Sequence, residues 1–253
     1  MTVLEAIGLA CAAFAAGGIN SVAGGGSLVS FPALLAAGYP AKTANVTNTV
    51  ALWPGHVGGS LGYRDLLVPQ RRTVVALSTS SILGAIAGSA ILLSTPESAF
   101  EAIVPFLILF AVLLLALQTR VAVFVATRRQ PGAASGRIPV VLHAAVFGLA
   151  VYGAYFGAGL GILTLAVLGI VLPDDLQRSN ALKGVLSLLI NAVAVIYFAA
   201  FGPVEWLPAI VMAAAALAGG YLGVHVARRL SSQVLRTAVV LFGLVVAGIL
   251  FVR

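Results

Sequence analysis

Uncharged stretches divide this chain into long apolar segments. They cover residues 6–41, 43–63, 73–96, 102–119, 138–173, 184–204, 206–227 and 237–252. A helix needs about 20 apolar residues to cross the hydrocarbon core of a bilayer. Six of the stretches fit one helix each, so the pattern predicts an all-α polytopic membrane protein.

Two of the stretches, 6–41 and 138–173, are too long for one crossing. Each would form a helix of roughly 54 Å, against a hydrocarbon core of about 30 Å. Glycine weakens a helix and adopts positive φ angles without strain. Glycine clusters stand in the middle of both stretches. The first is Gly24, Gly25 and Gly26, followed by Ser27, and the second holds Gly157, Gly159 and Gly161. We therefore expect interrupted helices near Gly24–Gly26 and Gly157–Gly161.

With these interruptions the chain is expected to form about ten helical segments. They are 3–22, 26–38, 42–62, 72–94, 98–127, 138–155, 160–172, 176–200, 204–228 and 232–252. The second and the seventh are short enough to be half-spans, whose turns would be protected inside the membrane by neighbouring helices. Whether these two segments cross the membrane completely stays open.

The two long stretches also reveal an internal repeat. At an offset near 135 residues, Asn45 aligns with Asn180, His56 with Asn191, Gly84 with Gly219 and Gly88 with Gly223, while Gly25 falls near Gly159. The alignment predicts two membrane repeats of five segments, 1–127 and 138–253, which form one integral membrane domain. The polar, basic linker 128–137 between them is expected to be cytoplasmic.

Loop charges predict how the segments are oriented. Lysine and arginine accumulate in cytoplasmic loops. The basic loops follow the third, fifth and ninth segments, at Arg64, Arg71, Arg72, Arg128, Arg129, Arg137, Arg228, Arg229 and Arg236. The two repeats are then inverted relative to each other, and both termini are external.

Composition supports the membrane class and limits the partners. Hydrophobic residues make up 61% of the chain and charged residues 8%, against about 25% charged in soluble domains. The net charge of +7 is explained by the positive-inside rule, so no nucleic-acid partner is expected. With one cysteine and three histidines, no disulfide, metal site or cofactor is predicted.

An inverted repeat with interrupted helices is typical of a secondary transporter, with the substrate near the midplane. The helices that follow Gly24–Ser27 and Gly157–Gly161 would point their first amides and positive dipole ends at a shared cavity, which is an anion site built from backbone. The alternative is that these glycines only allow close helix packing.

Polar side chains at helical spacing form a second candidate lining. Lys183 could supply a countercharge to an anion, or its ammonium group could extend to the interface. His56 could couple transport to protons or serve as a hydrogen-bonded structural residue. The Asn residues could contact substrate or join helices. The complete candidate set on these two segments is Asn45, Asn48, His56, Asn180, Lys183 and Asn191.

Enzymes and ATP-driven pumps are poor fits. The chain has no G-x-x-x-x-G-K-[ST] motif, and no nucleophile–base pair or metal dyad stands out. We therefore expect a protein that is not an enzyme.

The glycine-rich run and the segment after it resemble a known family. Residues 24–35, GGGSLVSFPALL, and 41–52, AKTANVTNTVAL, look like the sulfite exporter TauE/SafE family. In the second half, 178–183, RSNALK, and 219–223, GGYLG, are similar to one branch of it. The family motif falls on Gly24, Gly25, Gly26 and Pro32, whereas the second half has a sparser glycine run and no matching proline.

The resemblance implies a permease for sulfite or an organosulfonate in the cytoplasmic (inner) membrane. We expect alternating access of a small anionic substrate, with a proton or sodium as a candidate coupling ion. The alternatives are a passive anion channel and a non-transporting accessory membrane subunit. A cation substrate is disfavoured, because the carboxylates stand at segment ends. Substrate, direction and oligomeric state are left open.

Overall fold

The computed structural model describes residues 1–22, 25–61, 67–127, 138–172, 176–227 and 232–252. These residues form α-helices and one short 3-10 turn, η1 (Val68–Gln70), with no strand among them. The helices are α1 (Val3–Val22), α2 (Ser27–Ala36), α3 (Ala41–Leu61), α5 (Arg71–Ser94), α6 (Glu97–Thr127), α7 (Val140–Tyr155), α8 (Leu160–Val171), α9 (Leu176–Phe201), α10 (Trp206–Ala227) and α11 (Ser232–Val252).

The helix boundaries confirm the predicted all-α class and both interruptions. α1 and α2 divide the first long apolar stretch, and α7 and α8 divide the second. The short helices α2 and α8 have 10 and 12 residues. Gly161 is the second residue of α8, which fits the expected helical segment 160–172. The turn needs positive φ angles only at Gly157 and Gly159.

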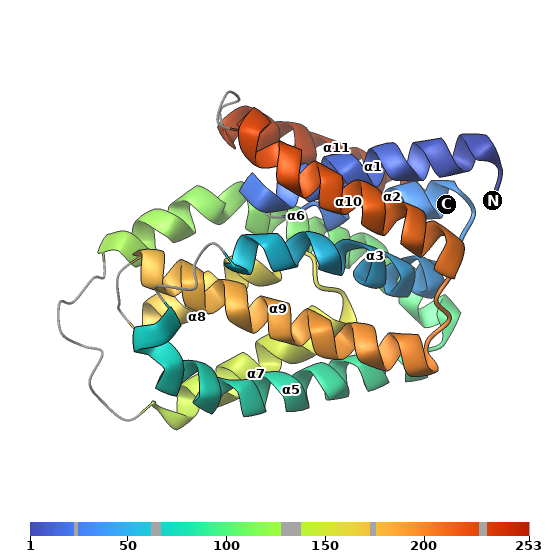
Figure 1. Cartoon of the computed structure of the whole chain (residues 1–253). Coiled ribbons are helices and arrows are strands. Elements are labelled where there is room, and N and C mark those ends of the chain that lie inside the picture. Colours follow the sequence, from blue (N-terminus) through green and yellow to red (C-terminus); the bar gives the residue numbers. More distant parts are fainter. Residues whose placement is uncertain (23–24, 62–66, 128–137, 173–175, 228–231, 253) are drawn as a thin grey trace.

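Helices from opposite halves of the chain are interleaved (Figure 1). α1 packs along α10, and α7 packs along α5. α3 contacts α10, and α9 contacts α5, while α3 meets α9 and α6 meets α11. In the order of segments along the two halves, α1, α3, α5 and α6 correspond to α7, α9, α10 and α11. The α1–α10 pair therefore corresponds to α7–α5, and α3–α10 to α9–α5, while α3–α9 and α6–α11 each join corresponding helices. The inverted relation of the halves in the membrane stays a prediction.

Small residues allow the closest of these crossings. A Cβ atom added to Gly219 of α10 would overlap the carbonyl oxygen of Phe14 on α1. In the other pair, a Cβ on Gly84 or Gly88 of α5 would overlap the carbonyl oxygens of Phe147 or Val151 on α7. Glycine at such points lets two helix backbones touch, as in many membrane bundles.

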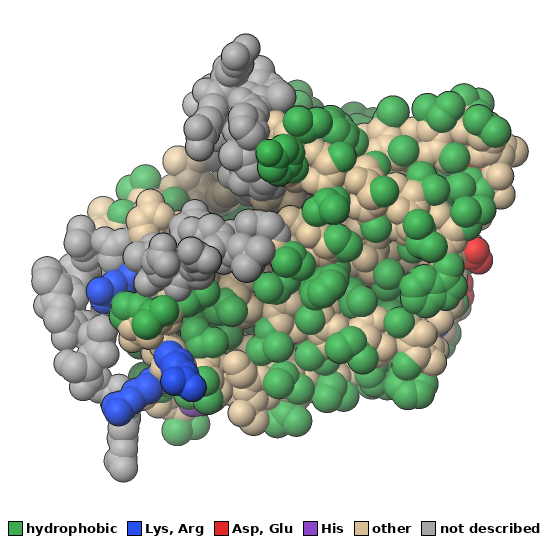
Figure 2. All heavy atoms as spheres, viewed as in Figure 1, with side chains coloured by type: hydrophobic (Ala, Val, Ile, Leu, Met, Phe, Trp, Pro, Cys, Tyr) green, Lys and Arg blue, Asp and Glu red, His purple; other side chains and the backbone are tan. Residues whose placement is uncertain are grey.

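The outside of the bundle is apolar. Figure 2 shows hydrophobic side chains spread across the visible face, with charged side chains only towards its two ends among the residues drawn in colour. Exposed large hydrophobic side chains on α6 and α11 include Ile103, Phe106, Phe110, Leu113, Leu241, Phe242, Leu244 and Val245. By length and composition, four helical spans among the described residues can cross a membrane: Val3–Asn20, Val68–Ser94, Glu97–Thr127 and Gln177–Phe201. This is the surface of an integral membrane protein.

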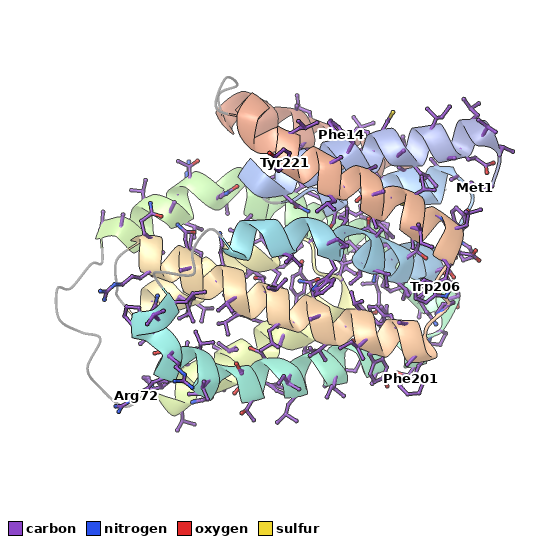
Figure 3. The ribbon with its side chains drawn as sticks, in the orientation of Figure 1. Met1, Phe14, Arg72, Phe201, Trp206 and Tyr221 are labelled. Atoms are coloured by element: carbon purple, nitrogen blue, oxygen red, sulfur yellow. The ribbon has the colours of Figure 1, made fainter. Side chains whose placement is uncertain are left out.

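Charge separates to the two ends of the bundle. Arg72 lies at the end opposite to Met1, Phe201 and Trp206 (Figure 3). The space-filling view shows Lys and Arg side chains at the first end and an acidic side chain at the second (Figure 2). The start of α1 and the end of α11 lie at the second end (Figure 1). This arrangement fits the predicted orientation, which stays a prediction; most of the other loop arginines lie outside the described residues.

Candidate functional site

The first interruption is a tight turn held by a side chain of α1. Gly25 has a φ angle of +88°, which favours glycine. The N–H of Gly26 donates to Oδ1 of Asn20 at 2.7 Å. Ser27 is the first residue of α2, and Gly24 lies outside the described residues. The Gly26 amide, a predicted anion ligand, is therefore already bonded in this conformation.

The second interruption needs two left-handed residues. Gly157 and Gly159 have φ angles of +79° and +81°. The hydroxyl of Tyr152 donates to the carbonyl oxygen of Ala158 and ties the turn back to α7. The Gly159 carbonyl then accepts the first-turn amides of Ile162 and Leu163. α8 therefore begins directly at a glycine turn, with the positive end of its dipole at that turn.

The two turns lie against the same part of α6. A Cβ built on Gly25 would lie 3.3 Å from Leu115, and one built on Gly159 would lie 2.9 Å from Leu114. The ring of Phe31 on α2 also packs edge-on against Phe156 in the second turn, with centroids 5.7 Å apart. The structure therefore brings together the two glycine clusters, which stand far apart in the sequence.

Asn45 on α3 joins the two halves at the second turn. Its Nδ2 donates to the carbonyl oxygen of Tyr155 at 2.9 Å. Tyr155 is the last residue of α7, and the last carbonyls of a helix have no donor within the helix. Asn48, one turn further along α3, is only 4% exposed. Its Oδ1 has no hydrogen-bond partner among the described residues. A buried amide oxygen without a donor is costly, and a ligand can supply that donor.

Lys183 on α9 lies over the start of α8. Its aliphatic carbons are 3.7 and 3.9 Å from the place where a Cβ on Gly161 would stand. Its Nζ donates to Oδ1 of Asn180 at 3.1 Å. No carboxylate among the described residues lies within ion-pair distance of this ammonium group. A cation in this position can take an anion as its partner.

The remaining predicted residues are less informative. Asn191 donates from Nδ2 to the Ser187 carbonyl of its own helix at 2.8 Å. For His56, the backbone lies in α3, but its side chain falls outside the described residues.

Sequence reasoning missed two groups. Asn20 caps the first turn, and its only signal was a lone amide just before the glycine cluster. The Tyr155 carbonyl had no signal, because a backbone group carries none. Ser187 shares the helical spacing of Asn180, Lys183 and Asn191, and its buried hydroxyl has no hydrogen-bond partner among the described residues.

A comparison with protein-family models places this architecture. Residues 9–250 match the family described as sulfite exporter TauE/SafE. The chain belongs to the sulfite exporter TauE/SafE family. The resemblance read from the glycine-rich motif is thereby confirmed over nearly the whole chain, and the protein is a membrane transporter of this family.

Curated relatives of this TauE/SafE protein carry transporter names. A "Probable membrane transporter protein" of Haemophilus influenzae is 27% identical over 239 residues, covering 92% of this chain and 89% of the relative. The "Probable membrane transporter protein ORF9" of Sinorhizobium sp is 27% identical over 246 residues, covering 93% and 88%. The "Probable membrane transporter protein YfcA" of Escherichia coli K12 is 26% identical over 224 residues, covering 86% and 77%. No solved structure matches this TauE/SafE protein.

Proposed function

We propose that this protein is a secondary transporter that moves a small sulfur-containing anion, such as sulfite or an organosulfonate, across the cytoplasmic membrane. The observation that carries the proposal is Lys183. Its side chain lies over Gly161 at the start of α8, and its ammonium group donates to the amide oxygen of Asn180 on α9. It has no carboxylate partner among the described residues. An uncompensated cation inside a helix bundle is costly, and a bound anion would offset that cost.

Neighbouring groups supply the rest of the proposed site. The glycine turns and Ser27 begin the short helices α2 and α8, whose amino ends favour an anion. Asn48 offers a buried amide on α3, one helical turn from Asn45. Because the Gly26 amide is bonded to Asn20, it would reach the substrate only after the Asn20 side chain moves away.

Alternating access would move the two halves relative to each other around these turns. The Asn45 bond to the Tyr155 carbonyl joins the first half to the turn of the second half. A shift between the halves would have to remake this bond, so Asn45 can report on the conformational state as well as on the substrate. A transported ligand shifts the population toward the conformation that it binds better, and the two conformations would differ in this bond.

Two other functions make different predictions. A passive anion channel would show flux that rises with concentration without saturation. An accessory subunit would show no flux when it is purified and reconstituted alone. The paired interruptions favour the transporter, because a partly buried ammonium group without a carboxylate partner among the described residues suits an anion site better than a scaffold.

The test combines binding and flux. Purified protein is heated with sulfite, sulfate, thiosulfate, taurine or sulfoacetate, since a bound ligand raises the unfolding temperature by mass action. Reconstituted vesicles then measure flux of the stabilising anion. Lys183→Ala should lose both the stabilisation and the flux, while Lys42→Ala should keep them. Lys42 is the matched control, because its Nζ donates to the carbonyl oxygen of Leu93, near the last residue of α5, and not to a group of the proposed site. Unchanged flux in Lys183→Ala would remove Lys183 from the site.

A further inference from the structure

The two halves of the proposed site are not chemically equal. Residues 135 apart occupy corresponding places on α3 and α9, and Trp53 and Leu188, which are such a pair, touch each other where these helices meet. The same offset pairs Asn45 with Asn180, and Asn48 with Lys183. One of these two pairs keeps the same side chain, and the other replaces an amide by an ammonium group.

Of the aligned positions 48 and 183, only 183 carries a cation. Lys183 lies over Gly161 at the start of α8, and Asn180 accepts its hydrogen bond. Its counterpart Asn48 is neutral and almost fully buried, with an oxygen that has no partner among the described residues. Along α9, the nearest described cation is Arg178, about 7.5 Å nearer the start of the helix.

We propose that the protein selects anions by charge number: the site accepts an anion with a single negative charge and rejects a doubly charged anion of the same shape. This inference rests on the proposed function. One partly buried ammonium group neutralises one negative charge. The two helix ends carry only partial positive charges, so a second negative charge would stay incompletely compensated in a medium of low dielectric.

The same reasoning explains what position 48 does. With an amide there, α3 can bind a neutral part of the substrate by hydrogen bonds but cannot balance a second charge. A lysine at this position would make the two sides alike. The residue at position 48 thus determines whether monoanions or dianions are preferred.

The test uses two tetrahedral anions of similar size, methanesulfonate with one negative charge and sulfate with two. Stabilisation of the purified protein is titrated with each anion. For the wild type we expect methanesulfonate to act at a concentration about tenfold lower than sulfate, or lower still. Asn48→Lys should shift this ratio toward sulfate, whereas Asn48→Gln, which lengthens the side chain without charge, should leave the ratio unchanged. The exchanged variant Asn48→Lys with Lys183→Asn should prefer methanesulfonate again.

The outcomes separate the two proposals. Equal binding of both anions by the wild type would overturn the charge-number selection while leaving an anion transporter. An identical ratio in the Lys and Gln variants would also overturn it. If Asn48→Lys does not fold, the wild-type ratio decides alone. If neither these anions nor the sulfur compounds named above bind, the proposed function and this inference both fall.

Discussion

The indole nitrogen of Trp53 lies 3.4 Å from the carbonyl oxygen of Leu188, and these two residues hold the same position in the two halves of the chain. At the offset of 135 residues that aligns the two halves of the sequence, Trp53 and Leu188 are a matched pair. Their contact lies near the middle of α3 and α9, the two helices that carry Asn48 and Lys183. Any movement of one half against the other must turn about this contact or break it.

Trp53→Phe should remove the hydrogen bond and keep an aromatic ring between the two helices. We expect a loss of about 0.5–1.5 kcal/mol in the free energy of unfolding. Thermal unfolding in detergent measures the loss. Trp206→Phe is the matched control, because Trp206, the other tryptophan of the chain, is 52% exposed at the end of the bundle. Equal effects of the two changes would show that the Trp53–Leu188 contact contributes nothing.

The glycines at the helix crossings should not accept a methyl group. Gly84→Ala and Gly219→Ala would each place a Cβ against a backbone carbonyl of the facing helix. We expect each to lower stability by about 1–3 kcal/mol through overpacking. Gly8→Ala and Gly148→Ala are controls, because nothing lies within 4 Å of a Cβ at either position. Those two should be neutral or slightly stabilising, since alanine favours a helix. Destabilisation by the controls alone would contradict the crossing geometry.

Gly159→Ala should affect the second turn in two ways. The positive φ angle strains an alanine by about 1–2 kcal/mol, and the new Cβ would press on Leu114 of α6. Gly38→Ala separates the two effects, because Gly38 has a φ angle of +87° with nothing within 4 Å of a Cβ. Thermal unfolding should show the larger loss for Gly159→Ala. Vesicle flux should fall in Gly159→Ala and persist in Gly38→Ala, and the reverse order would exclude the second turn from the transport path.

Asn45→Asp should break the connection between the halves. A carboxylate in place of Nδ2 puts an acceptor opposite the Tyr155 carbonyl, so both oxygens lose a donor. We expect a cost of about 1–3 kcal/mol in stability and a matching loss of flux. Thr49→Val is the control, since the Thr49 hydroxyl bonds only to the Asn45 carbonyl of its own helix. If Thr49→Val costs as much as Asn45→Asp, the inter-half bond has no special role.

Orientation can be tested with reporters. The loop charges predict both termini outside the cytoplasm. A reporter fused to the C-terminus that is active only in the periplasm should be active, and one fused within 128–137 should be inactive. A cytoplasmic C-terminus would reverse the topology and place the Lys183 end of α9 on the other side.

Part of this protein could be predicted from sequence because the relevant physics is local. The membrane class follows from charge spacing, which any bilayer-spanning helix must obey. The interruptions follow from run length: two stretches too long for one crossing each hold a glycine cluster, and α1 and α7 end beside those clusters. The same rule placed the start of the second short helix at residue 160, where α8 begins, and left Gly157 and Gly159 to the turn.

Other features were decided only by tertiary structure. Repeat alignment relates Asn48 to Lys183, but spacing cannot show that Lys183 lies over Gly161 or that Asn48 keeps an oxygen without a partner. Asn45 bonds to a carbonyl 110 residues away, and backbone groups leave no mark in a sequence pattern. Asn20 takes the Gly26 amide because the turn folds back onto α1. Side chains on helices from both halves meet only after those helices pack, so the sequence determined where the chain breaks and the packing decided which groups face those breaks.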